Sequence, residues 1–279
     1  MSDADERKAI LERLAALDTP TLARLAALLT DRQDVADSGS TYLDHLPAVA
    51  QSDVTGLTTS ERSYGNAWKR RGGVDTFHML SRKWDRIEKR LATSIDATAE
   101  TPGATPYDIF EHIAADRSAE GFIDDVRDMR RYLMLIEAEM LARKAANVAD
   151  SGRGYLDQFA NIAQRDIETI KEKERAYGST WKQRGGISAF MVFARKWDRI
   201  ERRVATRVGA ADGAPAAARD NIFEHIAADR RAEGVINDIR DLRRYLMLVE
   251  AEMAARGALQ IGTARDNREA SSPHFFSGR

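Results

Sequence analysis

The chain has 279 residues, 31% charged and 43% hydrophobic, so it is long enough for two domains with proper cores and has the composition of a soluble helical protein. Its net charge of −1 excludes a global field that would draw it to nucleic acid or an anionic membrane, and the lack of cysteine excludes disulfides and thiolate metal sites. The N-terminus is acidic, unlike a secretory signal, and no apolar run approaches the roughly 20 residues of a membrane span, so we expect a cytoplasmic protein.

The chain contains an internal duplication. Residues 64–73, with the sequence YGNAWKRRGG, recur as residues 177–186, with the sequence YGSTWKQRGG. The offset of 113 positions holds without insertion or deletion between residues 38–140 and 151–253, and more than half of the paired positions are identical. A period this long predicts a duplicated domain.

The duplication and the sequence outside it predict the domain organisation. Residues 1–37 carry leucines at helical spacing with a break at Thr19-Pro20, which predicts a helical hairpin that docks on the repeats or on another subunit. We expect four parts: the hairpin 1–37, a first helical domain 38–145, a second helical domain 151–256 and a loose tail 257–279.

Each repeat has the pattern of four helices, and no stretch alternates as a strand does. The predicted helices cover 42–63, 75–93, 108–113 and 119–144 in the first repeat and 155–176, 188–206, 221–226 and 232–256 in the second. Pro47 should delay or kink the first helix. We therefore expect an all-α fold of two tandem four-helix repeats that form a pseudo-twofold pair.

Acidic residues recur in pairs, three positions apart, on the second and fourth predicted helices. The pairs are Asp85 with Glu88 and Asp125 with Asp128 in the first repeat, and Asp198 with Glu201 and Asp238 with Asp241 in the second. If the two helices face each other, four carboxylates converge and require a cation, and all-oxygen ligation suits Mg²⁺ or Mn²⁺. The alternative is a ladder of ion pairs along each helix, such as Asp85 with Lys89 and Asp128 with Arg131.

The loop between the first two helices of each repeat combines aromatic and basic side chains. They are Tyr64, Trp68, Lys69 and Arg71 in the first repeat and Tyr177, Trp181, Lys182 and Arg184 in the second. Aromatic rings can stack on a nucleobase, and Lys and Arg can hold phosphates. The alternative is that the tryptophans fill the core. That alternative is at least as good for Trp84 and Trp197, and both interpretations stand equally for Trp68 and Trp181.

Three motifs together carry a resemblance to known proteins: YGxxWKxRGG, RKWDRIE and EGxxxD[IV]RDxRRYLML. From the loop to the last helix, each repeat resembles the nucleotide modification associated domain type 1 family, small helical proteins common in phage genomes. More distantly it is similar to the MazG-like all-α NTP pyrophosphatases. That resemblance implies a helical bundle in which the acidic pairs bind Mg²⁺ and nucleoside triphosphates are cleaved to monophosphate and pyrophosphate. It also implies a dimer-like arrangement of the repeats, with sites near their interface.

The chain departs from the MazG-like pattern where Asp replaces Glu at two positions and where Arg127 lies inside the second pair, which puts turnover in question.

Three functions follow as hypotheses. The first is a metal-dependent nucleotide pyrophosphatase in phage nucleotide metabolism or DNA modification, in the host cytoplasm. The second is a non-catalytic nucleotide binder that sequesters a signal, and the third is a structural protein that assembles through its N-terminal hairpin. Nucleic-acid binding ranks lower, because basic and acidic residues are interleaved.

Overall fold

The computed structural model describes residues 41–99, 108–116, 121–208, 221–229, 231 and 234–261. The predicted N-terminal hairpin, the tail beyond residue 261 and most of the two connectors between the second and third predicted helices lie outside these residues. The described residues form eight α-helices and no strand, which confirms the all-α class. None of these helices is long and apolar enough to cross a lipid bilayer.

The described elements follow one another in the same order in both halves. They are α3 (Tyr42–Tyr64), the 3₁₀ helix η1 (Ala67–Gly73), α4 (Val74–Ala99), α5 (Ile109–Ala115) and α6 (Phe122–Ala146), then η2 (Gly154–Gln158), α7 (Phe159–Tyr177), η3 (Thr180–Lys182), η4 (Arg184–Gly186), α8 (Ile187–Val208), α10 (Ile222–Ala228) and α11 (Val235–Ala255).

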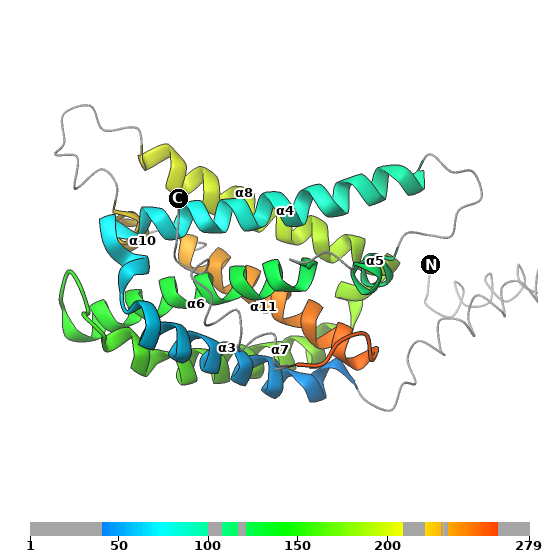
Figure 1. Ribbon diagram of the computed structural model, residues 1–279, viewed down its shortest axis with the longest axis horizontal. Coiled ribbons are helices and arrows are strands. Elements are labelled where there is room, and N and C mark those ends of the chain that lie inside the picture. The colour runs from blue at the N-terminus through cyan, green and yellow to red at the C-terminus, as the bar shows by residue number, and fades with distance from the viewer. Residues whose placement is uncertain are drawn as a thin grey trace, which may run out of the picture. The chain divides into compact units, whose positions relative to one another are not determined.

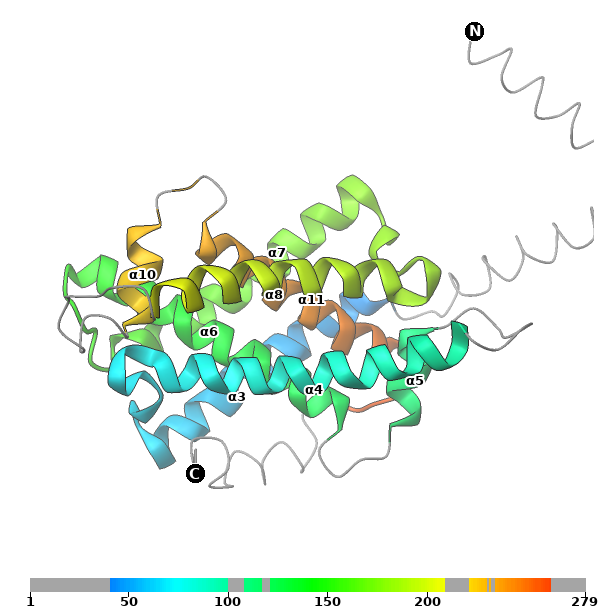
Figure 2. The same cartoon turned by 90° about the horizontal axis from the view of Figure 1, so that it is seen from above.

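The long helices pack in three layers (Figure 1). α4 and α8 lie side by side in one outer layer, as the view from above also shows (Figure 2). α6 and α11 form the central layer, α3 and α7 form the opposite outer layer, and the short helices α5 and α10 lie at opposite ends. The described residues from Tyr42 onward form one compact unit with one apolar core, so both halves of the sequence contribute to the same core.

The apolar stripe of α4 is buried as its periodicity predicts. Phe77, Leu80, Trp84, Ile87 and Leu91 are each at most 8% exposed. Such a stripe, three or four residues apart, places its side chains on one face of a helix. The tryptophans of α4 and α8 meet between the layers: the rings of Trp84 and Trp197 stack with centroids 6.1 Å apart and an interplanar angle of 24°. This confirms that both belong to the core.

The first helix of the first repeat covers the predicted residues, whereas that of the second repeat begins differently. α3 runs from Tyr42 to Tyr64, and Pro47 lies inside it on the exposed side, so of the two expected effects of this proline the late start does not occur. Water can bond the carbonyl oxygen that loses its helical partner at an exposed proline. In the second repeat, which has Ala160 at the equivalent position, the segment instead begins as the 3₁₀ helix η2 before α7.

The central layer buries charged side chains as well as apolar ones. Arg130 of α6 is 1% exposed, with Nη2 2.9 Å from Oδ1 of Asp53 on α3 and 2.6 Å from Oε2 of Glu250 on α11. Arg127 adds a second ion pair to Glu250, with Nε 2.7 Å from Oε1. The guanidinium of Arg130 therefore joins its own half of the sequence to the other half.

The same arrangement recurs 113 positions later in the chain. Arg243 of α11 is 1% exposed, with Nη2 3.0 Å from Oδ1 of Asp166 on α7 and 2.6 Å from Oε2 of Glu137 on α6. Arg240 Nε lies 2.6 Å from Oε1 of Glu137. We call these two sets of residues the central ion network. Each carboxylate in it is buried and charge-paired, the condition under which a buried charge is tolerated.

The central ion network predicts loss of stability in acid. Burial alone would raise the pKa of Glu137 and of Glu250, but the facing guanidinium groups outweigh it and hold both pKa values below the ordinary one. A depressed folded-state pKa stabilises the fold fully above the ordinary glutamate pKa of about 4.3, and the effect is lost as the pH falls through the folded-state pKa. Urea unfolding should therefore show a falling free energy of unfolding below about pH 4.3. A Glu137→Gln, Glu250→Gln variant should be less stable at neutral pH and show a shallower acid dependence. An equal acid dependence in both proteins would contradict this origin.

Two loop glycines have a positive φ, and only one of them also lacks room for a side chain. Gly186 has φ +77°, and a Cβ added there would lie 2.8 Å from Cε2 of Phe110 on α5. Gly178 has a similar φ of +61° but nothing within 4 Å of such a Cβ. Gly178 combines its positive φ with ψ −167°, a backbone region essentially restricted to glycine, so Gly178→Ala should cost about 1–3 kcal/mol for the backbone alone. Gly186→Ala should cost about 1–3 kcal/mol more than its own backbone cost, because overpacking is added. Urea denaturation measures both, and equal losses would show that the contact with Phe110 is unimportant.

Candidate functional site

The predicted carboxylates of the first repeat do not converge. Asp125 of α6 is fully buried and is neutralised by basic side chains of α4. These are Lys83, with Nζ 3.3 Å from Oδ1, Arg86, with Nε 3.0 Å from Oδ2, and Arg90, with Nη1 3.3 Å from Oδ2. Asp128 is also paired with Lys83. Asp85 and Glu88 are exposed on a different face of α4.

The second repeat shows the same arrangement. Asp238 of α11 is 1% exposed and is neutralised from α8. Its partners are Lys196, with Nζ 3.3 Å from Oδ1, Arg199, with Nη2 2.5 Å from Oδ1, and Arg203, with Nη1 3.0 Å from Oδ2. Lys196 Nζ also lies 2.5 Å from Oδ2 of Asp241. Asp198 is exposed, and Glu201 accepts a 3.0 Å hydrogen bond from Ser81 of α4.

These positions do not fit a resident Mg²⁺ or Mn²⁺ ion. Within the described ranges, no three His, Asp or Glu side chains come together as a metal site requires. The buried Asp125 and Asp238 already face three cationic side chains each, so a metal ion would have to displace these side chains. The ion-pair alternative accounts for Asp125, Asp128, Asp238 and Asp241, although most of these pairs run between helices, and the pair of Asp241 with Arg244 runs along one helix.

The loop residues of the first repeat are built into the core or point into solvent. Trp68 is 3% exposed, edge-on to Tyr155 and to Phe223. Lys69 is also buried, with Nζ 3.1 Å from Oε2 of Glu139. Arg71 has an 81% exposed side chain, and Tyr64 is half-buried. The structure thus supports the packing interpretation for Trp68, and Lys69 is engaged by a carboxylate instead of being open to a phosphate.

The loop of the second repeat lies beside an open pocket. Trp181 is only partly buried, and its ring meets Tyr42 edge-on at 5.3 Å and Phe110 at 5.9 Å. Tyr177 is 71% exposed. Lys182 pairs with Glu252 at 3.1 Å and does not line the pocket. The side chain of Arg184 is not among those described.

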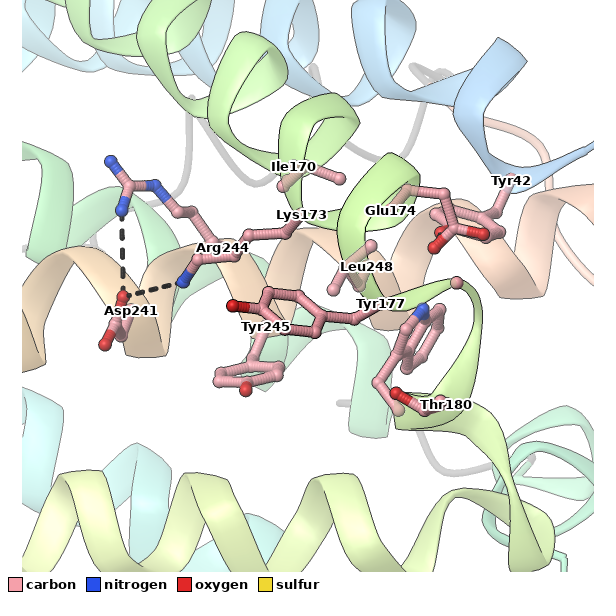
Figure 3. A pocket seen from close by; sticks show the side chains of 12 residues that line it. Tyr42, Ile170, Lys173, Glu174, Tyr177, Thr180, Asp241, Arg244, Tyr245 and Leu248 are labelled. Carbon is pink, nitrogen blue, oxygen red and sulfur yellow. Dashed lines mark hydrogen bonds and ion pairs between the residues drawn. The ribbon is translucent and has the colours of Figure 1, made fainter. Parts of the chain in front are cut away.

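The pocket has a volume of about 200 Å³ and lies between α7, η3 and α11. Its lining combines aromatic, basic and acidic side chains: Tyr42, Lys173, Glu174, Tyr177, Thr180, Trp181, Asp241, Arg244 and Tyr245, with Ile170, Gly178 and Leu248. Figure 3 shows Arg244 and Asp241 at one end, Tyr42 and Thr180 at the other, and the rings of Tyr177 and Tyr245 between them. We call this cavity the aromatic pocket.

The charged end of the aromatic pocket is an ion cluster. Lys173 Nζ lies 3.4 Å and Arg244 Nη1 3.7 Å from Oδ1 of Asp241. Burial alone would raise the pKa of Asp241, but the hydrogen bond from Lys196 and the charge of Lys173 hold it below the ordinary value. Asp241 is therefore ionised at neutral pH and holds the two pocket cations in place.

The equivalent place in the first repeat is closed. The counterparts of Lys173, Trp181 and Tyr245 are Ser60, Trp68 and Tyr132, each at most 3% exposed. Arg131, the counterpart of Arg244, lies against Gly56, where an added Cβ would be 2.8 Å from its Cζ. The second repeat has Thr169 on α7 at the position of Gly56. The side chain of Thr169 occupies the space that the guanidinium of Arg131 uses in the first repeat, so Arg244 cannot pack against α7 in the same way. Small side chains in the first repeat thus allow the space to be filled.

Several pocket residues were not among the predicted site residues, namely Lys173, Arg244 and Tyr245. Arg244 and Tyr245 recur in the first repeat as Arg131 and Tyr132, so their sequence does not mark them, whereas Lys173 is opposite a serine. For Lys173 the usable signal was this difference between the copies, because a basic residue gained in one repeat marks a place where they diverge chemically.

Comparison of the chain with protein-family models, with curated proteins and with solved structures gives no match.

Proposed function

We propose that the chain binds one nucleotide in the aromatic pocket of the second repeat and does so without a resident metal ion. The observation that carries the proposal is that one cavity offers aromatic rings and, at its other end, two cations. Nucleotides have the matching chemistry, a planar base joined to an anionic phosphate.

The aromatic part of the pocket suits a base. Tyr177 is exposed and is not one of the buried core residues, and its ring lies between the two ends of the cavity (Figure 3). Stacking on such rings contributes about 1–3 kcal/mol per base in proteins that bind single-stranded nucleic acids. Trp181 closes the far end through its contact with Tyr42.

The basic part of the pocket suits a phosphate. Lys173 is exposed and Arg244 is partly exposed, so both can turn N–H groups toward an anion while Asp241 anchors them. The volume of about 200 Å³ is below the roughly 300–1,000 Å³ of pockets that enclose a drug-sized ligand. The pocket therefore holds part of the nucleotide and leaves the remainder outside.

The proposal includes a pseudo-twofold relation between the repeats. Two pairs of reciprocal contacts support it. Tyr42 donates a hydrogen bond to Glu174, and Tyr155 donates one to Glu61. Likewise Trp181 packs on Phe110 while Trp68 packs on Phe223. The chain would thus be a fused dimer in which one of two equivalent places has become a binding site.

Two substitutions in the pocket test the proposal. Lys173→Ser, which installs the first-repeat residue, and Tyr177→Ala should each weaken binding of nucleoside monophosphates of the four common bases by about tenfold or more, since each removes a contact of about 1.5 kcal/mol. Lys171→Ser is the matched control, because Lys171 is exposed on the same helix and does not line the pocket. Isothermal titration measures the affinities. Unchanged affinity in both pocket variants would refute this site.

Mg²⁺-dependent hydrolysis stays a prediction that follows from the family resemblance. Chromatography of the titrated mixtures, with and without Mg²⁺, tests it directly. Intact nucleotide at the end of the incubation would favour the sequestering function over the pyrophosphatase. Binding of no nucleotide at all would favour the third hypothesis, a structural or assembly role.

A further inference from the structure

A second cavity, of about 220 Å³, lies next to the aromatic pocket along α7. The aromatic pocket is lined by α7 residues from Ile170 onward, and the second cavity by α7 residues from Ile162 to Glu172. Arg244 lines both cavities. The two cavities are therefore neighbours that share Arg244 as part of their lining.

All the basic residues that line this second cavity are arginines. Its four arginines are Arg165, Arg240, Arg243 and Arg244. Arg243 is 1% exposed, and its Nη1 is buried without a hydrogen-bond acceptor in the part of the chain that the structure describes. The equivalent atom of the first repeat, Nη1 of Arg130, reaches the carbonyl oxygen of Leu246 at 3.4 Å. A buried guanidinium N–H without an acceptor is costly, so Arg243 brings unused hydrogen-bonding capacity to a residue that lines this cavity.

The acidic residues of the cavity divide into two kinds. Glu137 and Asp166 already pair with Arg243, and each leaves part of that guanidinium unused. Glu168 and Glu172 are exposed at the rim. Glu137 also pairs with Arg240, and Asp166 also pairs with Arg244. An anion in the cavity would therefore meet arginine N–H groups together with two paired carboxylates inside, and the carboxylates of Glu168 and Glu172 at the entrance.

We propose that this arginine-lined cavity is a second phosphate subsite of the ligand bound in the aromatic pocket, so that the ligand carries at least two phosphate groups. The inference rests on the proposed function. One phosphate would lie by Lys173 and Arg244, and the next beyond Arg244, where planar guanidinium groups give bidentate contacts. The second phosphate comes either from a di- or triphosphate chain or from the next residue of a dinucleotide.

The test compares mono- and polyphosphate probes on matched variants by isothermal titration. Adenosine and guanosine 5′-mono-, di- and triphosphates and the linear dinucleotides pApA and pGpG are titrated into the full chain. At least one probe with two phosphates should bind about tenfold or more tighter than the monophosphate. Arg165→Gln should reduce that preference several-fold and leave monophosphate affinity unchanged. Glu172→Gln should increase it, because the variant removes a negative charge at the rim. Arg175→Gln, exposed on α7 and outside both cavities, is the control.

Each outcome decides the inference. The two classes of probe are phosphate chains and dinucleotides. The class whose tighter binding is lost in Arg165→Gln identifies the source of the second phosphate. Equal affinity for mono- and polyphosphates, or a preference that Arg165→Gln leaves intact, overturns the subsite while the nucleotide pocket stands. If no probe binds, the proposed function fails and the subsite fails with it.

Discussion

Replacing Arg130 by methionine is expected to lower the free energy of unfolding by about 3–5 kcal/mol. The substitution removes the guanidinium that joins Asp53 to Glu250 and leaves two buried carboxylates, each at most 1% exposed, with too little positive charge. Urea denaturation at neutral pH measures the loss. Arg82→Met is the control, since Arg82 is exposed on α4 and should change stability by no more than about 0.5 kcal/mol.

A compensating variant separates loss of charge balance from loss of packing. Replacing Arg130, Asp53 and Glu250 together by apolar residues of similar size should restore much of the stability, because buried ion pairs are often no better than well-packed apolar groups. Arg127 would then lose its partner Glu250 and Arg131 its partner Asp53, so full recovery requires their replacement too. If Arg130→Met is nearly as stable as the natural chain, the central ion network does not hold the two halves together as described.

Trp84→Ala is expected to destabilise the protein by about 3–5 kcal/mol. The indole is 2% exposed between the outer and central layers and stacks on Phe190 at 5.9 Å as well as on Trp197. Its removal leaves a cavity at the meeting point of α4 and α8. Met191→Ala is a control on the neighbouring helix, because Met191 is 56% exposed and should contribute little. Similar small losses in both variants, measured by urea denaturation, would mean that the α4–α8 contact is not part of the common core.

The helices could be predicted from the sequence because their apolar residues repeat at helical spacing. The stripe from Phe77 to Leu91 and its partner in α8 are buried as predicted. The layer arrangement could not be predicted in the same way. Arg130 and Glu137 stand within the apolar stripe of α6, where a charge has to be paired to be buried, but the sequence does not say which helix supplies the partner.

The candidate site was harder to predict for a specific physical reason. Lys83, Arg86 and Arg90 are three or four positions apart, so α4 turns one basic face toward Asp125 and its acidic pair away from it. That spacing was present in the sequence and favoured ion pairs over a metal site. The aromatic pocket depends instead on Lys173 and Thr169, which differ from Ser60 and Gly56 of the first repeat. The effect of these two differences on the cavity can be seen only when the positions of the packed helices are known.

The most direct test of the account is an isothermal titration of the full chain with nucleotides in the presence of a metal chelator. We expect saturable binding of one nucleotide per chain, which Lys173→Ser abolishes or weakens by about tenfold. Binding of two nucleotides per chain would contradict the closed state of the first repeat. Binding that disappears when the chelator is added would contradict a pocket that works without a metal ion.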